Sequence, residues 1–275
     1  MRQTVSLLLA GMLLLAACSA SGAGTIETAA VYEAPVYRFS DLTAQESFQS
    51  EEGVQLAYYD YKLFTLTVDN LDSLSPEDQT AAERNLESFN DRARKVLEEA
   101  VDYGRELPEI AEALDGPALS STVLCDETTA QGYMGGEIIS VRTDTWGYTG
   151  GAHGYSYTTG YTFDLSTGQF IDPVQLADDP AVFQEAAGDA LIAAADSLSR
   201  EQRDLYWDNY RNIIREWNNG AVYFSQVGMT VIFSAYELGP YVLGPVELTL
   251  GWEALAELMG PGGVERLGMA PAAEN

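Results

Sequence analysis

The stretch Tyr148–Gly168, which reads YTGGAHGYSYTTGYTFDLSTG, constrains the fold more than any other part of the chain. It holds the only histidine, His153, between a Gly-Gly pair and a further glycine. Glycine on both sides lets the backbone adopt positive φ or approach another surface closely. The alternating aromatic run that follows has strand character, and the segment Asp164–Gly168 has turn chemistry. The stretch therefore predicts a glycine-rich loop that leads into a β-hairpin.

A long amphipathic helix is predicted after two N-terminal strands. The strand-like segments are Val31–Phe39 and Gly53–Asp69, both rich in aromatic and branched residues. Ser75 provides an N-cap and Pro76 the first helical position. Apolar residues then recur at three- and four-residue spacing to about Gly104, and charged residues occupy the opposite face. Leu107–Asp115 is expected to continue as a short helical turn. This pattern indicates a packing helix that carries no chemistry.

The rest of the chain contains further strand-like and helical segments and no internal repeat. Segregated runs of this kind predict an α+β fold, with antiparallel sheets covered by helices. We expect an N-terminal α+β subdomain (31–115), a C-terminal α+β subdomain (116–260) and a flexible tail (261–275) rich in Gly, Pro and Ala. The further predicted elements are the strands Leu119–Glu127, Glu137–Asp144, Tyr155–Asp164, Val222–Gln226, Met229–Ser234 and Val246–Leu250, and the helices Asp178–Leu198, Arg200–Trp217 and Trp252–Met259.

The N-terminus has the form of a bacterial lipoprotein signal. After a short basic segment, Val5–Leu15 is an apolar run of signal-peptide length, too short to be a comfortable transmembrane helix. The run ends in Leu15-Ala16-Ala17-Cys18, which resembles a lipobox. We therefore expect a signal peptide (1–17), then a lipidated Cys18 that opens a flexible tether (18–30), with the protein on the extracytoplasmic face of the cell membrane. The alternative is an ordinary secretory signal with an incidental cysteine.

The net charge narrows the class of binding partner, and the cysteine content argues against an intrachain disulfide. The net charge is −28, from 42 acidic and 14 basic residues, which repels phosphate backbones and argues against nucleic-acid binding. It favours a basic partner through electrostatic steering, or it only keeps a secreted domain soluble. Lipidation of Cys18 leaves Cys125 without an intrachain disulfide partner. Cys125 is therefore expected to be a small buried side chain rather than a reactive thiol.

Catalysis by His153 has no supporting local motif. Ser156 and Cys125 are candidate nucleophiles, but no nucleophile elbow marks either of them. A zinc site normally needs three or four His or Cys ligands, and no calcium-loop spacing is present. A pair of catalytic carboxylates is not singled out among the 42 acidic residues. The sequence therefore predicts no catalytic residue, no metal and no cofactor, and leaves His153 as a structural residue or a ligand contact.

Aromatic side chains in or beside the glycine-bearing loops point to ligand binding more strongly than any feature points to catalysis. Exposed Tyr and Trp form binding platforms for proteins and sugars, although strand and loop packing is the alternative explanation. The predicted ligand-binding residues are Trp146, Tyr148, Gly150, Gly151, His153, Tyr155, Tyr236 and Tyr241.

Two separated segments together resemble a known family. Gly150–Gly154 and Thr162–Gly168 resemble a GGAHG…TFDLxTG signature, and Phe233–Tyr241 followed by Gly244 resembles its closing F-x-x-Y-E-x-x-P-Y-x-x-G segment. The signature is that of the extracytoplasmic domain of RsiV-type anti-sigma factors, which also precedes the deacetylase module of PdaC-type peptidoglycan deacetylases. The similarity extends over roughly Val31–Met259, so the C-terminal subdomain is expected to be RsiV-like. The resemblance implies an α+β sensor or binding domain in the cell envelope.

The same resemblance implies the class of ligand. In RsiV-type proteins the domain binds lysozyme, which is strongly basic, so a lysozyme-like protein or a peptidoglycan fragment is the expected partner. A lipobox stands here in place of a transmembrane anchor and a sigma-binding segment, and we recognise no deacetylase module. Sigma-factor control and deacetylation are therefore not expected. The sequence predicts a non-enzymatic, lipid-anchored binding or sensor lipoprotein, with a cell-wall hydrolase that uses His153 or a structural envelope lipoprotein as the alternatives.

Overall fold

The computed structural model describes residues 32–114, 122–217 and 221–269, nearly all of which belong to one compact unit, Glu33–Asn275. The predicted signal peptide, Cys18 and the tether lie outside these ranges, as do residues 119–121 of a predicted strand and the residues 270–275. None of the helices in the described ranges combines the length and the apolar character that crossing a membrane requires.

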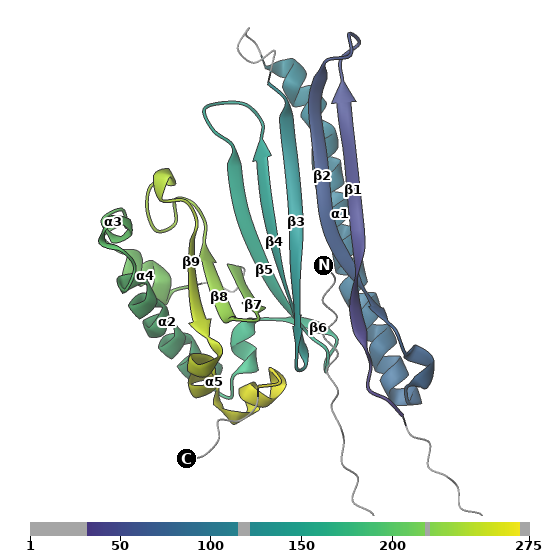
Figure 1. Ribbon diagram of the computed structural model, residues 1–275, viewed down its shortest axis with the longest axis vertical. Coiled ribbons are helices and arrows are strands. Elements are labelled where there is room, and N and C mark those ends of the chain that lie inside the picture. The colour runs from purple at the N-terminus through teal and green to yellow at the C-terminus, as the bar shows by residue number, and fades with distance from the viewer. Residues whose placement is uncertain (1–31, 115–121, 218–220, 270–275) are drawn as a thin grey trace, which may run out of the picture. The chain divides into compact units, whose positions relative to one another are not determined.

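A six-stranded sheet forms the larger layer, with its strands in the order β1 to β6 (Figure 1). Neighbouring strands are antiparallel except β2 and β3, which pair in parallel. A parallel pair needs a long crossover connection, and the helix α1 provides it. The predicted α+β class, with helices covering antiparallel sheets, is confirmed, and the sheet is mixed at this one pair. The strands are β1 (Tyr37–Gln49), β2 (Gln55–Val68), β3 (Leu124–Gly135), β4 (Ile138–Tyr148), β5 (Tyr155–Asp164) and β6 (Gln169–Ile171).

The helix α1, Pro76–Ala113, begins where the sequence predicts and ends nine residues later than predicted. The Ser75 side chain accepts a hydrogen bond from the backbone N–H of Asp78 at 3.1 Å, which confirms the N-cap. The predicted end at Gly104 is wrong, because the helix runs through this glycine and includes most of the turn predicted over Leu107–Asp115. Gly104 lies against the ring of Tyr59, where a Cβ atom would come within 2.4 Å of the ring.

The last turns of α1 are held by tertiary packing. Leu107 is fully buried and forms a small core with Ala57 of β2 and Leu124 of β3. The helix contains Pro108 within this region, although proline in a helix interior costs about 3 kcal/mol. Burial of the neighbouring apolar side chains offsets that cost, which explains why a local pattern alone places the helix end too early.

A three-stranded antiparallel sheet forms the smaller layer, in the order β7-β8-β9. Its Val and Phe side chains pack with helices α2, α4 and α5 around the largest buried cluster. The predicted hairpin between the first two strands is confirmed, and Gly228 adopts φ +137° there. The elements are α2 (Pro180–Asp196), α3 (Arg200–Arg203), α4 (Tyr210–Arg215), β7 (Val222–Ser225), β8 (Gly228–Phe233), β9 (Val246–Gly251) and α5 (Trp252–Arg266).

The strand predicted to end at Glu127 is β3, which continues to Gly135 because it pairs with β4 along that length. Two further predicted elements differ from the structure because tertiary contacts override the local pattern. The strand predicted over Val31–Phe39 begins only at Tyr37 and continues to Gln49. Its second half is polar, and pairing with β2 keeps it extended. The single helix predicted over Arg200–Trp217 is instead the two short helices α3 and α4. They are separated where the backbone N–H of Trp207 donates to the carbonyl of Leu238 at 2.8 Å.

Residues 261–269 are ordered, so the flexible tail predicted for 261–275 is wrong for this part. Gly260 adopts φ +78° and bends α5, which then continues to Arg266. Val264 and Leu267 are buried, and burial of these apolar side chains stabilises the segment.

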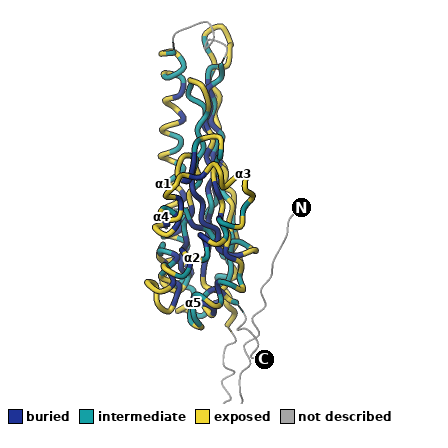
Figure 2. The backbone as a smooth tube through the Cα atoms, turned by 90° about the vertical axis from the view of Figure 1, so that its left-hand side faces the viewer, coloured by how far each residue is buried: buried dark blue, intermediate teal, exposed yellow. Residues whose placement is uncertain are grey.

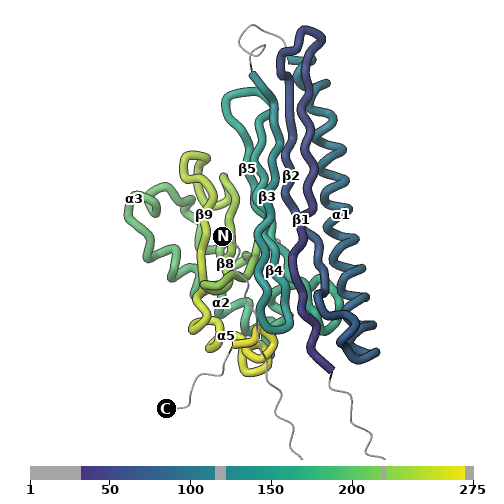
Figure 3. The backbone as a smooth tube through the Cα atoms, turned by 45° about the vertical axis from the view of Figure 1, so that its right-hand side comes forward, coloured from purple at the N-terminus to yellow at the C-terminus, as the bar shows by residue number. Residues whose placement is uncertain are grey.

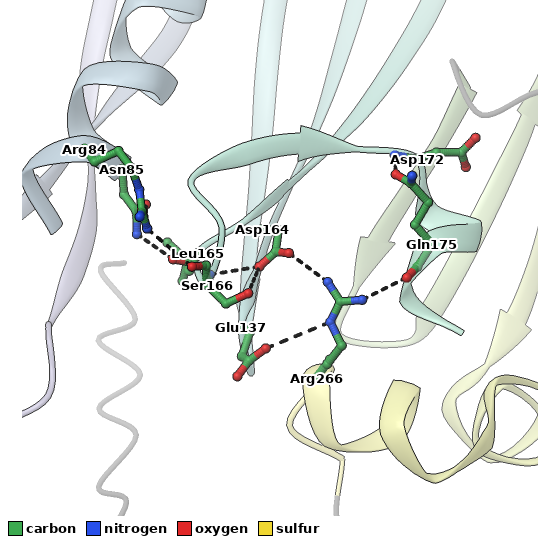
Figure 4. Close-up of polar contacts among 9 residues, drawn as sticks. All are labelled: Arg84, Asn85, Glu137, Asp164, Leu165, Ser166, Asp172, Gln175 and Arg266. Carbon is green, nitrogen blue, oxygen red and sulfur yellow. Dashed lines mark hydrogen bonds and ion pairs between the residues drawn. The ribbon is translucent and has the colours of Figure 1, made fainter. Parts of the chain in front are cut away.

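A polar junction joins this last helix to the predicted turn Asp164–Gly168 (Figure 4). The buried carboxylate of Asp164 accepts hydrogen bonds from the backbone N–H and the hydroxyl of Ser166, at 2.8 and 2.7 Å. It also pairs with Arg266 at 2.8 Å, and Arg266 donates to the carbonyl of Gln175. From α1, Asn85 donates to the carbonyl of Leu165 at 2.8 Å. The turn therefore connects α1 and α5 through polar contacts.

The small sheet docks on the face of the large sheet opposite to α1 (Figures 1 and 3). The backbone N–H of Phe224 in β7 donates to the hydroxyl of Ser140 in β4 at 2.8 Å. The carbonyl of Val222 lies so close to Gly160 in β5 that a Cβ atom there would be 2.1 Å from it. In Figure 2 the buried residues gather along the strands and on the helix sides that face them. The predicted boundary at residue 115 does not separate two sheets, because β2 and β3 pair across it.

Candidate ligand-binding groove

A groove opens on the docked face of the large sheet, beside the start of β9. Its floor consists of polar side chains from β3, β4 and β5, and Pro245 and Glu247 form the opposite wall. The volume is about 350 Å³, within the range of small-ligand sites. We call it the β3–β5 groove. It is lined by Glu127, Thr129, Arg142, Asp144, Thr145, Trp146, Ser156, Tyr157, Thr158, Pro245 and Glu247.

Arg142 is the centre of the polar contacts in the groove. Its guanidinium contacts Asp144 at 2.8 Å and Glu247 at 2.8 Å, and it donates to the hydroxyl of Tyr223 at 2.9 Å. Burial alone would lower the pKa of Arg142, but these three hydrogen-bonding partners outweigh burial and raise it. The side chain is only 16% exposed, so this cation is permanently charged and largely committed to its present partners.

Carboxylates outnumber cations in this groove. Glu127, Asp144 and Glu247 line it together with a single arginine, and that arginine already pairs with two of them. Glu127 accepts a hydrogen bond from the hydroxyl of Tyr58 at 2.6 Å, which raises the pKa of Tyr58. The local charge is therefore negative, and it attracts a basic or hydrogen-bond-donating ligand and repels an anionic one.

The exposed side chain of Trp146 forms one end of the groove, and a cluster of aromatic rings lies next to it across Gly154. Trp146 is 47% exposed, and Figure 1 shows the end of β4, where it lies, beside the glycine-rich loop. In that loop the ring of His153 stacks on Tyr241 with a centroid separation of 4.3 Å, and Tyr236 lies 5.5 Å beyond. We call His153, Tyr236 and Tyr241 the aromatic rim. Because Tyr241 comes from the β8–β9 connection, the rim joins the large sheet to the small one.

The backbone conformation explains why the loop contains glycines. Gly150 and Gly151 adopt φ +100° and +92°, a region that favours glycine, and Tyr148 donates to the carbonyl of Gly151 at 2.7 Å. The carbonyl of Gly154 accepts from Tyr241 at 3.3 Å. The loop predicted from the glycine pattern is therefore present and is held in a turned conformation against the rim.

The structure brings together most of the predicted binding residues but not all of them. Trp146 lines the groove, and His153, Tyr236 and Tyr241 form the rim. Tyr155 points to the other face of the sheet, where its hydroxyl donates to the buried carboxylate of Asp126 at 2.5 Å. Burial and this hydrogen bond raise the pKa of Tyr155. Its contact therefore belongs to the α1 side of the sheet, away from the groove.

The surroundings of His153 give no acid–base constellation among the described residues. Its Nδ1 atom lies 2.8 Å from the carbonyl of Gly154, and its ring stacks on Tyr241. Cys125 is a buried free thiol in β3, and burial raises its pKa. In the described ranges no group of three or more His, Cys, Asp or Glu side chains is placed to hold a metal ion.

Sequence reasoning missed the polar residues that line the floor and the wall. Arg142 and Asp144 alternate with the buried residues Val141 and Thr143, so a two-residue period in β4 could have placed both on one face. No local pattern marks Glu247, which contacts Arg142 across 105 residues of chain. Only the docking of the two sheets makes this contact.

Comparison with known proteins finds a family model that matches part of the chain. Residues 188–253 match the family model DUF3298, described as a protein of unknown function. This range includes Phe233–Tyr241, one of the two segments that carry the resemblance, whereas Gly150–Gly168 lies outside it. A search of curated proteins gave no match.

A solved structure of a DUF3298 family member is similar in fold over a longer part of the chain. The crystal structure of a DUF3298 family member from Bacteroides fragilis matches with a TM-score of 0.56 at 15% sequence identity, and the match covers 85% of this chain and 98% of that chain. A DUF3298 family protein from Pseudomonas aeruginosa matches with a TM-score of 0.49 at 15% identity, covering 83% of this chain and 96% of that chain. The first match shows that the likeness of fold extends well beyond residues 188–253.

Proposed function

We propose that this protein is a lipid-anchored, extracytoplasmic binding or sensor module that recognises a cell-envelope ligand through the β3–β5 groove. The ligand is a lysozyme-like basic protein or a peptidoglycan fragment, and the module carries out no chemistry on it. The observation that carries the proposal is the excess of carboxylates over cations in a groove that ends in the exposed side chain of Trp146, beside the aromatic rim. Carboxylates beside exposed Trp and Tyr suit a ligand that is basic or rich in donors.

The net charge of −28 supports the same proposal at longer range. A strongly acidic protein steers a basic partner toward itself, and this steering weakens as salt screens the charges. The groove then provides the local contacts. The resemblance to RsiV-type domains points to the same ligand class.

Binding of lysozyme and of soluble muropeptides tests the proposal. We expect at least one of them to bind the full chain in a calorimetric titration at near-physiological salt. Glu127→Gln is expected to weaken that binding about fivefold, because it removes one groove carboxylate from the attractive field. Glu87→Gln is the matched control, since Glu87 is exposed on α1 outside the groove, and its affinity should equal that of the wild type.

Three outcomes would contradict the proposal. Absence of binding to both ligands would leave only a structural role. An equal loss of affinity in Glu127→Gln and Glu87→Gln would place the interaction outside the groove. Turnover of cell-wall material by the wild type but not by a folded His153→Ala variant would support a hydrolase instead.

Lipid attachment at Cys18 is tested separately. In bacterial cells fed an alkyne-bearing palmitate analogue, we expect the wild-type protein to be labelled and to sediment with membranes. Cys18→Ala should be unlabelled, because the thiol that carries the lipid is absent. Cys125→Ala is the control and should be labelled like the wild type, since Cys125 is buried in the folded domain. Labelling that persists in Cys18→Ala would reject the anchor.

A further inference from the structure

A second depression lies farther along β3, beyond the β3–β5 groove. It has a volume of about 240 Å³, and its lining comes from β3 and from the β7–β8 hairpin. The residues that matter here are Gln131 and Tyr133 on β3, and Tyr223, Ser225 and Gln226 on the hairpin.

The two depressions lie on one line along the same face of one strand. Glu127 and Thr129 line the first, and Gln131 and Tyr133 line the second. In a strand, side chains two residues apart point to the same face, so these four form a single row. At about 3.4 Å per residue, the row from Glu127 to Tyr133 spans about 20 Å.

A shared pair of side chains separates the two depressions. Arg142 lines the first and Tyr223 lines the second, and they hydrogen-bond to each other at 2.9 Å. The guanidinium also lies over the Tyr223 ring, 5.1 Å from its centroid. An extended ligand that occupied both depressions would therefore cross this pair.

The chemistry of the row fits a polyhydroxylated chain. Thr129, Gln131, Ser225 and Gln226 carry hydroxyl or amide groups, which both donate and accept hydrogen bonds as sugar hydroxyls do. Trp146 supplies an exposed aromatic face at one end, and Tyr133, whose ring packs with Trp252, lines the other end. The core of a protein interface is typically poor in Ser, Glu and Asp, so this lining suits a protein partner less well.

The charge of the first depression narrows the class of sugar ligand further. Its carboxylates outnumber its single arginine, which repels acidic sugars and attracts protonated amines. We propose that the two depressions together seat an extended amino-sugar oligomer, with an amino group at the carboxylates of the first and later sugar units over Gln131. This inference rests on the proposed function and names the ligand of the same groove.

Oligomer length tests whether both depressions act together. Glucosamine disaccharide and hexasaccharide are titrated against the full chain by calorimetry. We expect the hexasaccharide to bind at least tenfold more tightly, because only the longer chain reaches the second depression. Gln131→Ala should weaken hexasaccharide binding about fivefold and leave disaccharide binding unchanged. Glu127→Gln should weaken both.

Controls separate this inference from the proposed function. Gln169→Ala removes an exposed glutamine of β6, outside both depressions, and should bind like the wild type. The N-acetylated hexasaccharide should bind more weakly than the glucosamine form, with a smaller difference at high salt. Equal affinity for the two lengths, or no effect of Gln131→Ala in a variant that melts like the wild type, would overturn the inference. If lysozyme or muropeptide binding remained sensitive to Glu127→Gln while the hexasaccharide failed to bind, the inference would fall and the proposed function would stand.

Discussion

Replacing Arg266 with alanine is expected to lower the free energy of unfolding by about 3 kcal/mol. The guanidinium contacts the carboxylate of Asp164 at 2.8 Å, and that carboxylate is only 1% exposed. Without Arg266, Asp164 keeps its hydrogen bonds from Ser166 but loses the cation that compensates its burial. Denaturant unfolding followed by circular dichroism measures the loss.

Arg215→Ala is the matched control for this prediction. Arg215 pairs with Asp189 at the same distance, 2.8 Å, but the two side chains are 51% and 62% exposed. Exposed pairs contribute about 0 to 1 kcal/mol, so this variant should unfold almost like the wild type. If both variants lost the same stability, burial of Asp164 would not be the reason for the effect.

The pH dependence of this pair follows from the pKa of Asp164. Burial alone would raise that pKa, but hydrogen bonds from Ser166 and the charge of Arg266 outweigh burial and hold it below its usual value. A carboxyl with a depressed pKa stabilises the fold above its unfolded pKa, about 3.9, and loses that contribution as pH falls through the folded pKa. The stability difference between wild type and Arg266→Ala should therefore be largest near neutral pH and shrink below about pH 4.

Gly160→Ala is expected to lower the free energy of unfolding by about 2–3 kcal/mol. The new Cβ would lie 2.1 Å from the carbonyl oxygen of Val222, so β7 must move away from β5. A backbone carbonyl in a paired strand cannot rotate aside as a flexible side chain could. The same displacement should disturb the contact between Arg142 and Glu247, and with it the ligand binding that we propose for the groove.

Gly251→Ala provides the comparison for Gly160→Ala. The nearest atom to a Cβ at Gly251 is 3.9 Å away, which is ordinary contact, so the expected change is below about 1 kcal/mol. Thermal and denaturant unfolding of both variants, together with ligand titration, measure the two effects. A Gly160→Ala variant with wild-type stability and affinity would show that the sheets do not depend on this close approach.

Local signals in the sequence predicted several elements correctly. The Ser75-Pro76 start of α1, the hairpin at Gly228 and the glycine-rich loop before β5 depend on capping, positive φ and turn chemistry. Each of these involves groups only a few residues apart. These elements can therefore be predicted without knowledge of the tertiary packing.

The same local reasoning failed where distant contacts decide the conformation. The end of α1 is fixed by the packing of Leu107 between two strands, and the order of α5 beyond Gly260 by burial of Val264 and Leu267. At Asp164 the sequence predicts only a turn. Its ion pair with Arg266, 102 residues away, makes it a junction.

The sequence alone therefore determined the α+β class, the starts of the principal elements, the acidic charge and the lipobox-like N-terminus, because composition and short spacings encode them. Only the tertiary structure decided where the groove lies. Its floor comes from neighbouring strands whose pairing gathers alternate polar residues, and its wall comes from Glu247 on a separate sheet. Contacts between segments about 100 residues apart have no periodic signature in the chain, since they exist only once the two sheets have docked.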